Sequence, residues 1–405
     1  MTNHPVVVIG AGAAGMFAAI CCRTQNQNRP VVILEKTKVP LAKVKISGGG
    51  RCNVTHACFT PSELVLNYPR GQKELLGPFN RFQPKDTIAW FEEHGVQLKT
   101  ERDGRMFPVT DSSQTIIDCL MQEAKRLGVI LKTEANVSGF EKQGDRFCIH
   151  IDGQPDIIAS KLLIASGSAR SILTQLEALG HTIQPQVPSL FTLNIASFSL
   201  VELAGLSVPN AELSLQHSKH RQKGPLLITH WGFSGPAALK LSAWAARDLN
   251  SVEYKEPLYV SWCAGISTES AYNKILEIKQ QEPKKLVSNI CPFSLPQNLW
   301  KRFVADLDTA RSYSDLSKSQ AQSLAVRLTR DCYQISGKTT NKEEFVTCGG
   351  IKLSEVDFKT MQSKLIPNLY FAGEALDIDG VTGGFNFQNA WTTGWLAGTD
   401  MGTSR

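Results

Sequence analysis

The residues best suited to chemistry lie near the start of the chain, where glycines recur as Gly10, Gly12 and Gly15. In such a turn the first glycine permits a tight bend, the second lets the backbone approach a pyrophosphate, and the third lets a helix pack against a strand. The free N–H groups and the dipole of that helix favour phosphate. Glu35 follows about 20 residues later, where a carboxylate accepts hydrogen bonds from ribose hydroxyls. The spacing predicts a dinucleotide site formed by Gly10, Ala11, Gly12, Ala13, Ala14, Gly15, Glu35 and Lys36.

A second glycine run, Gly48 to Gly50, stands directly before Arg51, Cys52 and Asn53. Consecutive glycines beside a dense polar cluster favour a loop pressed against a flat polar ligand, and the alternative is a flexible linker. Cys52 is a candidate proton donor or redox-sensitive thiol, and the alternative for it is a small residue that simply packs. The cofactor-binding residues expected in this segment are Lys43, Ser47, Gly48, Gly49, Arg51, Cys52 and Asn53.

Two further turns of small residues are expected to close over the cofactor. One ends an apolar strand at 161–165, and the other is a glycine-rich turn that feeds a helix expected from about residue 389 to 397. The positive end of that helix would point at the pyrimidine edge of a flavin ring. The alternative is a purely structural turn and helix cap. The residues assigned to these turns and their surroundings are Val137, Ala165, Gly167, Gly373, Glu374, Gly383, Gly384, Phe385, Asn386, Gln388 and Asn389.

Periodicity places these motifs on a βαβ unit, with buried strands at 6–9 and 31–34 around a helix at 13–23. Short alternating strands follow from 190 to 260, a polar helical segment from 270 to 330, and a return to strand, glycine turn and helix after 345. The chain therefore leaves its first domain and re-enters it. The expected domains are a cofactor domain of 1–188 and 345–405, a β-rich insert of 189–265 and a basic helical insert of 266–344.

The composition suits a globular protein, with 42% hydrophobic and 20% charged residues. No apolar run is long enough for a membrane helix, and the first residues lack the basic region of a signal peptide, so we expect a cytoplasmic protein with no membrane contact. The 10 cysteines are scattered without a C-x-x-C pair. This spacing argues against structural zinc and a dithiol reductase, so no metal site is expected and most thiols should be buried and free.

Basic residues gather in the inserts. Between residues 270 and 330 the sequence has ten Lys and Arg against five Asp and Glu, and a basic run at 217–224 is expected in a hairpin loop. Nucleic-acid binding needs such a footprint, and the alternative is a solvated helical face. The turn at 229–236 could hold a substrate phosphate or a nicotinamide cofactor, or could simply pack the insert. The candidate substrate residues are His230, Ser234, Gly235, Lys284, Lys285, Lys301 and Arg302.

Four motifs together resemble the BaiN/RdsA (YhiN-type) family of NAD(P)/FAD-dependent oxidoreductases. They read G-A-G-A-A-G, S-G-G-G-R-C-N, T-H-W-G-F-S-G-P and G-E-A-L-D-I-D-G-V-T-G-G-F-N-F-Q-N-A. The resemblance implies an α/β fold, in which a Rossmann-like FAD-binding domain of the two-dinucleotide-fold flavoprotein type is interrupted by a β-barrel-like domain and a small helical domain. It also implies FAD as cofactor and a double-bond reductase activity.

Members of that family have been linked to reducing a uridine of large-subunit ribosomal RNA and to reducing steroid enones. Because the sequence has no second G-x-G-x-x-G motif, NAD(P)H is expected to visit only transiently as electron donor. The expected partner is ribosomal RNA, or otherwise a small-molecule substrate. The competing hypotheses are a small-molecule ene-reductase or amine oxidase, and a non-redox, flavin-stabilised RNA-binding factor.

Overall fold

The structure is a computed structural model that describes residues 4–307, 312–339 and 346–403. Its internal contacts divide the chain into two compact units. Unit 1 comprises residues 1–187 and 342–405, and unit 2 comprises residues 188–341. The expected domain boundary at 344/345 lies outside the described residues.

Unit 1 is built on a seven-stranded sheet of order β19-β20-β21-β10-β1-β2-β6. The strands from β21 to β6 run parallel, and β19 and β20 add an antiparallel edge. Their apolar residues are buried on both faces in β1, β2 and β10, as expected for a parallel sheet covered on both sides. The bounds are β1 Val6–Ile9, β2 Val31–Leu34, β6 Ile130–Lys132, β10 Lys161–Ile164, β19 Val356–Asp357, β20 Gln362–Ser363 and β21 Leu369–Phe371.

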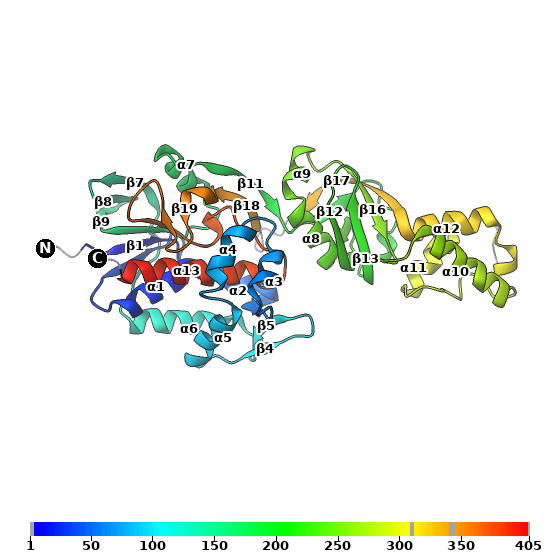
Figure 1. Ribbon diagram of the computed structural model, residues 1–405, viewed down its shortest axis with the longest axis horizontal. Coiled ribbons are helices and arrows are strands. Elements are labelled where there is room, and N and C mark those ends of the chain that lie inside the picture. The colour runs from blue at the N-terminus through cyan, green and yellow to red at the C-terminus, as the bar shows by residue number, and fades with distance from the viewer. Residues whose placement is uncertain (1–3, 308–311, 340–345, 404–405) are drawn as a thin grey trace. The chain divides into compact units, whose positions relative to one another are not determined.

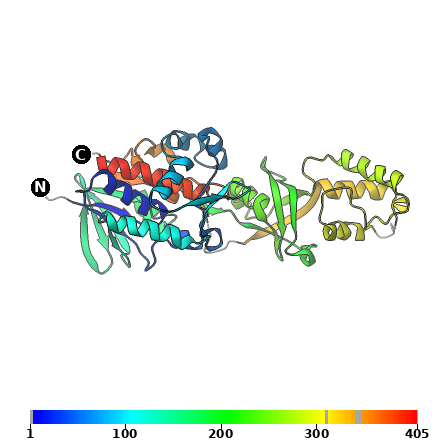
Figure 2. The same ribbon diagram turned by 90° about the horizontal axis from the view of Figure 1, so that it is seen from below.

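Three long helices lie beside one another in unit 1, with α1 (Ala13–Gln25) between α6 (Ser113–Arg126) and α13 (Phe385–Thr403) (Figures 1 and 2). Glycines let α1 and α13 approach closely. A Cβ atom at Gly398 would lie 2.3 Å from the Ala18 carbonyl oxygen, so no larger residue fits this contact. The C-terminal end of the chain is therefore packed directly onto the first helix.

Smaller elements surround this frame. The α-helices are α2 Ala42–Gly50, α3 Pro61–Leu64, α4 Gln72–Phe79, α5 Pro84–Glu93 and α7 Arg170–Ala178, and the 3-10 turns are η1 Val65–Asn67, η4 Leu353–Glu355 and η5 Gly373–Ala375. Three small sheets join β3 (Thr55–His56), β5 (Arg105–Pro108) and β4 (Leu98–Thr100); β7 (Val137–Gln143), β8 (Arg146–Ile151) and β9 (Gln154–Ala159); and β11 (Ile183–Ser189) and β18 (Val346–Ile351).

Unit 2 contains a closed barrel of order β12-β15-β14-β13-β16-β17. Its strands are β12 Thr192–Ile195, β13 Ser207–Leu215, β14 Arg221–Ile228, β15 Gly232–Ser234, β16 Pro257–Ser261 and β17 Asp331–Thr339. The helices and turns of the unit are α8 Gly235–Trp244, α9 Ala246–Ser251, α10 Thr268–Gln281, α11 Gln297–Ala305, α12 Lys318–Arg330, η2 Val201–Leu203 and η3 Tyr313–Asp315. One apolar core runs through barrel and helices, with Phe233, Trp262 and Phe303 buried in it.

The fold class expected from the sequence is confirmed, and two details differ. Residues 331–339 form β17 and complete the barrel, whereas the sequence placed them in the helical insert. Helix α13 begins at Phe385 rather than at residue 389, because the glycine turn before it ends at Gly384. All ten cysteines are free and most are buried, as expected. Among the described residues, no helix combines the length and apolar character that a membrane span needs.

Candidate cofactor site

The turn after β1 requires glycine at both of its ends. Gly10 has a φ of +105°, and a Cβ atom there would lie 2.5 Å from the Ala165 carbonyl oxygen. A Cβ atom at Gly15 would lie 2.0 Å from the carbonyl oxygen of Gly10. Since real Cβ atoms do not approach oxygen this closely, strand β1, the end of β10 and helix α1 can meet only around these glycines.

Gly12 differs from its neighbours because nothing in the protein crowds it. Its φ is −80°, and a Cβ atom there would meet no atom within 4 Å. Gly12 caps α1, and no side chain caps the first turn of that helix. The protein packing itself therefore does not require glycine here. Open backbone N–H groups at a helix N-terminus fit a pyrophosphate, whose approach would require glycine.

Glu35 directly follows β2 and faces the same turn. Its Oε2 accepts a hydrogen bond from the Ala11 N–H (2.9 Å), and its Oε1 accepts from the N–H (2.9 Å) and hydroxyl (2.8 Å) of Thr37. These bonds fix the carboxylate beside the glycine turn. An ionised carboxylate has about four acceptor positions, so capacity for a ribose hydroxyl remains. Lys36 follows on the surface, and Val137 begins β7 in a buried position.

The second glycine run forms a tight left-handed loop inside α2 rather than a linker. Gly48, Gly49 and Gly50 have φ values of +58°, +67° and +83°, and the Cys52 N–H donates to the Ser47 carbonyl (3.0 Å). A Cβ atom at Gly48 would lie 3.0 Å from the Phe107 ring, whereas Gly49 and Gly50 face open space. The loop is thus packed on one side and open on the other.

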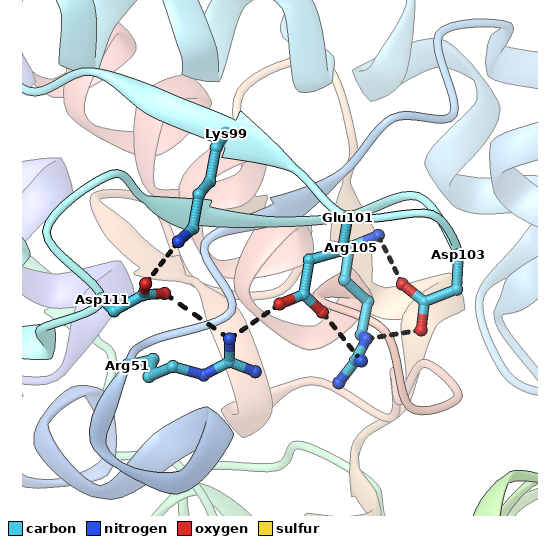
Figure 3. Close-up of polar contacts among 6 residues, drawn as sticks. All are labelled: Arg51, Lys99, Glu101, Asp103, Arg105 and Asp111. Carbon is cyan, nitrogen blue, oxygen red and sulfur yellow. Dashed lines mark hydrogen bonds and ion pairs between the residues drawn. The ribbon is translucent and has the colours of Figure 1, made fainter.

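Arg51 is held by acidic groups of the β4–β5 hairpin (Figure 3). Its Nη1 lies 2.7 Å from Glu101 Oε1 and 3.5 Å from Asp111 Oδ1, and its guanidinium lies 4.0 Å from the centre of the Phe107 ring. Lys99 hydrogen-bonds Asp111, and together with Arg51 it holds the pKa of that carboxyl below its usual value. These ion pairs hold Arg51, and with it the glycine loop, against this hairpin. Arg105 extends the network by pairing with Glu101 and Asp103.

Cys52 is fully buried and has a φ of +60°. Burial raises the pKa of its thiol to about 12. Because the thiolate is the reactive and oxidisable form, a neutral buried thiol favours packing over a role in proton transfer or redox sensing.

We expect Cys52→Ala to keep its flavin and its turnover within about twofold, because the group is not poised to ionise. Flavin content from the absorption spectrum and steady-state turnover on the reducible substrate check this. A variant with normal flavin content and abolished turnover would return Cys52 to the mechanism.

Asn53 joins the loop to the C-terminal glycine turn. Its amide nitrogen donates to the carbonyls of Thr55 (3.0 Å) and Met106 (3.3 Å), and its oxygen accepts from the Gly384 N–H (2.9 Å). A Cβ atom at Gly384 would lie 2.5 Å from the Thr55 carbonyl oxygen. Two motifs more than 300 residues apart in the chain therefore meet backbone to backbone.

Most polar residues at the start of α13 are satisfied within the protein. Asn386 accepts from the Gly380 N–H (2.8 Å) and donates to its carbonyl (2.9 Å), and the buried Gln388 accepts from the hydroxyls of Thr55 (2.6 Å) and Thr87 (3.0 Å). Phe385 stacks on His56, with ring centres 4.7 Å apart. These three residues shape the turn.

Seven buried side-chain polar atoms lack a hydrogen-bond partner within the described part of the chain, and three of them belong to or neighbour the segments assigned to the cofactor, namely Ser166 Oγ, Thr347 Oγ1 and Asn389 Oδ1. Ser166 follows Ala165, which closes on Gly10. Buried polar atoms are almost always hydrogen-bonded, so such atoms beside an open glycine turn fit a polar ligand. The residues around the two turns therefore suit a dinucleotide cofactor.

Glu374 gathers three parts of unit 1. Its carboxylate accepts from Lys43 Nζ (2.5 Å) and from the Thr347 N–H (3.1 Å), and a Cβ atom at Gly167 would lie 3.5 Å from its Oε2. The neighbouring Gly373 has a φ of +67°, and its N–H donates to the Thr393 hydroxyl (2.9 Å). The structure thus brings together the expected residues of α2, the end of β10 and η5.

A buried ion pair beside the C-terminal turn was not anticipated from the sequence. Arg70 hydrogen-bonds both carboxylate oxygens of Asp379, which is fully buried, while 11% of the Arg70 side chain is exposed. The pair ties the segment before α4 to the residues that lead into Gly383. The only sequence signal was the acidic D-I-D-G stretch before the glycines.

Removing one partner of this ion pair should lower the stability of the folded protein. We expect Asp379→Ala to lower the free energy of unfolding by about 3 to 5 kcal/mol, because it removes the carboxylate to which the largely buried Arg70 guanidinium makes two hydrogen bonds. Asp103→Ala, which breaks an exposed pair with Arg105, should cost about 1 kcal/mol or less. Chemical denaturation followed by flavin release measures both, and equal midpoints for the two variants would contradict the assignment.

The candidate substrate residues all lie in unit 2. Ser234 accepts a hydrogen bond from the Thr192 hydroxyl (3.0 Å), and Gly235 has a φ of +84° with Leu227 N 2.9 Å from where a Cβ atom would be. This part of the 229–236 turn therefore packs the barrel. His230 lies beside Trp231, which sequence reasoning missed and which is 66% exposed.

The basic candidates divide into two groups. Lys284, Lys285 and Lys301 are exposed, whereas Arg302 pairs with Glu202 (2.8 Å) and with Asp306 (2.5 Å). Arg302 therefore links α11 to η2, which favours a structural role for it. In the 217–224 run, only the first half forms the loop between β13 and β14, because β14 begins at Arg221.

The parallel sheet, the glycine turn opening α1 and the carboxylate that directly follows β2 define a Rossmann-type FAD-binding domain, and the protein is an FAD-dependent oxidoreductase. The family model described as the HI0933-like protein Rossmann domain matches residues 4–400. The chain belongs to this HI0933-like family, which confirms the resemblance that its motifs indicated.

Two relatives illustrate the range of the family. The chain is 30% identical to a ribosomal RNA dihydrouridine synthase of Escherichia coli, over 99% of this chain and 98% of the relative. It is 27% identical to a 3-dehydro-bile acid delta(4,6)-reductase of Clostridium scindens, over 96% and 97%.

The fold is shared with more distant solved structures. A 3-ketosteroid delta1-dehydrogenase from Sterolibacterium denitrificans covers 100% of both chains with a TM-score of 0.54 and 11% identity. A 3-ketosteroid-delta4-(5alpha)-dehydrogenase from Rhodococcus jostii covers 98% of this chain and 96% of its own, with a TM-score of 0.53 and 12% identity. At these identities the likeness concerns the fold alone.

Proposed function

We propose that the protein reduces the C5–C6 double bond of a uridine in ribosomal RNA to give dihydrouridine. The Escherichia coli relative and a relative from Haemophilus influenzae, 27% identical over 96% of both chains, are each named ribosomal RNA dihydrouridine synthase. NAD(P)H supplies the electrons in this proposal and binds transiently, as expected from the single G-x-G-x-x-G motif. Bound FAD supplies the hydride-transfer chemistry that amino-acid side chains lack.

The residues of unit 1 have distinct roles in holding this cofactor. The open turn at Gly12 and the N-terminus of α1 would bind the pyrophosphate, and Glu35 would accept from a ribose hydroxyl. Asn389 and the N-terminus of α13 would face the polar edge of the flavin ring. Arg51 and Asn53 would hold the two glycine loops in place.

Trp231 is the observation in this chain that favours RNA as the substrate. Its ring is 66% exposed, and the Thr229 hydroxyl accepts from the N–H groups of Trp231 (3.3 Å) and Gly232 (3.2 Å), which makes the turn rigid. Single-stranded RNA is recognised largely by stacking of unpaired bases on aromatic side chains. A rigid turn that presents a tryptophan to solvent suits that task.

The alternative is a small-molecule ene-reductase, which the bile acid reductase among the relatives supports. A pocket of about 430 Å³ on the barrel of unit 2 bears on this choice. Its lining combines Arg221, Arg330 and Glu212 with Tyr259 and several hydroxyl side chains, and Leu215 is its one apolar lining residue. A steroid would call for apolar walls, whereas this lining suits a polar ligand.

Mass spectrometry of ribosomal RNA nucleosides from cells with and without this gene tests the proposal. We expect dihydrouridine to disappear from large-subunit RNA without the gene and to return when the gene is restored. Unchanged dihydrouridine in both cells would reject the RNA substrate and favour the small-molecule reductase.

Trp231→Ala should raise the KM for RNA roughly 5- to 150-fold, because stacking of a base on an aromatic ring contributes about 1 to 3 kcal/mol. Flavin content should not change. Val201→Ala, which truncates another exposed apolar residue of unit 2, is the matched control and should leave KM unaltered. A Trp231→Ala enzyme with native KM would remove the stacking role.

A further inference from the structure

The strands β7, β8 and β9 form a small sheet of unit 1 (Figure 1). One face of this sheet carries carboxylate, thiol and imidazole side chains, which are the types that bind metals. Glu141 of β7 pairs across the sheet with Cys148 of β8, and His150 follows two positions later on the same face. Cys148 pairs with Ile158 of β9, which places Asp156 on that face as well. Register between strands, rather than spacing along the chain, therefore creates this group.

The distances within the group are close to those of a coordination sphere. Ligand atoms of Glu141, Cys148 and His150 all lie within 4.8 Å of one another. In tetrahedral zinc sites the bonds are about 2.0 to 2.3 Å long, so the ligand atoms stand roughly 3.3 to 3.8 Å apart. Shifts of about 1 Å in the side chains of Glu141 and His150 would therefore complete such a sphere.

Asp156 is placed to orient the imidazole. Its Oδ2 lies 3.0 Å from His150 Nδ1 and 3.8 Å from Cys148 Sγ. Histidine ligands of metals commonly donate their second ring N–H to a carboxylate, which fixes the ring and the tautomer. The Asp156–His150 pair has this form.

The sheet that carries these side chains is packed against the protein on its other face, and the cluster itself is open to solvent. The opposite face of the sheet buries Phe140, Phe147 and Ile149. Cys148 is buried, whereas 41% of the His150 side chain is exposed and Glu141 is exposed. An ion can therefore enter from solvent while the thiol stays fixed.

Two features of the same face support metal binding further. Gly139 lies across from His150, and a Cβ atom there would lie 3.3 Å from the imidazole ring, so glycine leaves the ring room to adjust. Two carboxylates surround one imidazole and one thiol, and Arg146 stands two positions before Cys148 at the end of the face. A divalent cation would offset the clustered acidic charge.

We propose that Glu141, Cys148 and His150 bind one zinc ion, with Asp156 as a positioning residue and water in the fourth position. A thiol and an imidazole together select a borderline-soft ion such as Zn²⁺ over Mg²⁺ or Ca²⁺. On binding, the Cys148 thiol releases its proton to solvent and the Zn–S bond forms, with no change of oxidation state. Bound zinc links β7 to β8 and stabilises this sheet.

Titration of the chelator-treated flavoprotein with Co²⁺ and then Zn²⁺ tests the site. One Co²⁺ per chain should give the ligand-field bands of a tetrahedral thiolate complex, at wavelengths longer than oxidised flavin absorbs, and one Zn²⁺ should remove them. Zinc should also raise the melting temperature, since it binds only the folded sheet. Absence of stoichiometric binding would overturn the proposal.

Variants separate this site from adventitious binding. Cys148→Ser should abolish the thiolate bands, and because Cys148 is buried, the exposed-ligand variants Glu141→Gln and His150→Gln provide tests that do not disturb packing. Each should weaken zinc binding at least tenfold, and Asp156→Asn should weaken it roughly 10- to 100-fold.

Cys332→Ser, which removes the exposed cysteine of unit 2, is the matched control and should bind zinc normally. Loss of the bands in Cys332→Ser, or native zinc affinity in His150→Gln, would assign the metal elsewhere and overturn the proposal. The flavin spectrum, recorded in the same samples, reports that each variant is folded.

Discussion

Gly12→Ala is expected to yield a folded protein that has lost its flavin. A Cβ atom at this position would meet no protein atom within 4 Å, and its φ of −80° is open to any residue. The fold itself should therefore accept alanine. The added methyl group would project where the backbone must approach the pyrophosphate, and we expect the affinity for FAD to fall more than tenfold, or by about 1.4 kcal/mol or more.

Two companion variants make this result interpretable. Gly15→Ala places a Cβ atom 2.0 Å from the Gly10 carbonyl oxygen, so it should lose both flavin and stability. Gly77→Ala, in α4, also meets nothing within 4 Å and is not among the glycines assigned to the cofactor, so it should keep native flavin. Flavin per chain from the absorption spectrum and far-UV circular dichroism measure binding and folding separately.

The comparison between Gly12 and Gly15 distinguishes a cofactor site from a glycine turn that only serves packing. If the glycine turn served packing alone, alanine would be tolerated at position 12, where no protein atom is close, and Gly12→Ala would resemble Gly77→Ala and retain flavin. A yellow Gly12→Ala protein with full FAD occupancy would therefore contradict the placement of the pyrophosphate at this turn.

The sequence predicted those parts of the protein in which neighbouring residues determine the structure. The strand, glycine turn and helix from Val6 to Gln25 are largely a local pattern, because Gly15 is required by its contact with the Gly10 carbonyl and Gly12 suits the approach of a pyrophosphate. Gly10 is the exception, since it is required by its contact with the distant Ala165. Glu35, which directly follows the next strand, also belongs to the local pattern. Alternation also indicated a β-rich insert, and the family resemblance implied that this insert is barrel-like.

Features that depend on distant partners could not be predicted in the same way. The buried pair of Arg70 and Asp379 joins segments 309 positions apart, and a single sequence carries no sign that these two charges meet. The metal-binding face depends on the register of Glu141 against Cys148, which cysteine spacing does not reveal. Strand β17 was misplaced because its partner strands β12 and β16 precede it by 70 residues or more.

The number of basic residues in a segment does not show how many of them are exposed, because some form ion pairs and hydrogen bonds within the protein. Ten basic residues between 270 and 330 suggested a footprint for nucleic-acid binding, with a solvated helical face as the alternative. In the structure several of these residues bond to other groups of the protein. Arg327 pairs with Asp306, and Lys279 donates to the carbonyl of Ser314 (3.2 Å). Lys284, Lys285 and Lys301 remain exposed, and these three are the residues on which an RNA interaction can be tested without disturbing the fold.

Reversing these three lysines to glutamate is expected to weaken RNA binding roughly 100-fold or more while flavin content stays native. Cations that contact phosphates release condensed counterions, so each lost contact should flatten the dependence of log K on log salt by about 0.9, and the three together by about 3. Arg302 is left intact because its pairs with Glu202 and Asp306 are structural, and changing it would confuse loss of binding with loss of folding.

The matched control reverses Lys73, Lys125 and Lys359, three exposed lysines of unit 1, and so alters the net charge equally. Binding of ribosomal RNA fragments at several salt concentrations, together with dihydrouridine formation, measures both variants. If RNA recognition resides in unit 2, only the first variant loses affinity and salt dependence. If both lose affinity equally, the attraction is a general effect of charge. If the unit 2 variant still modifies RNA normally at physiological salt, this surface does not bind the substrate, and the small-molecule reductase becomes the better account of the protein.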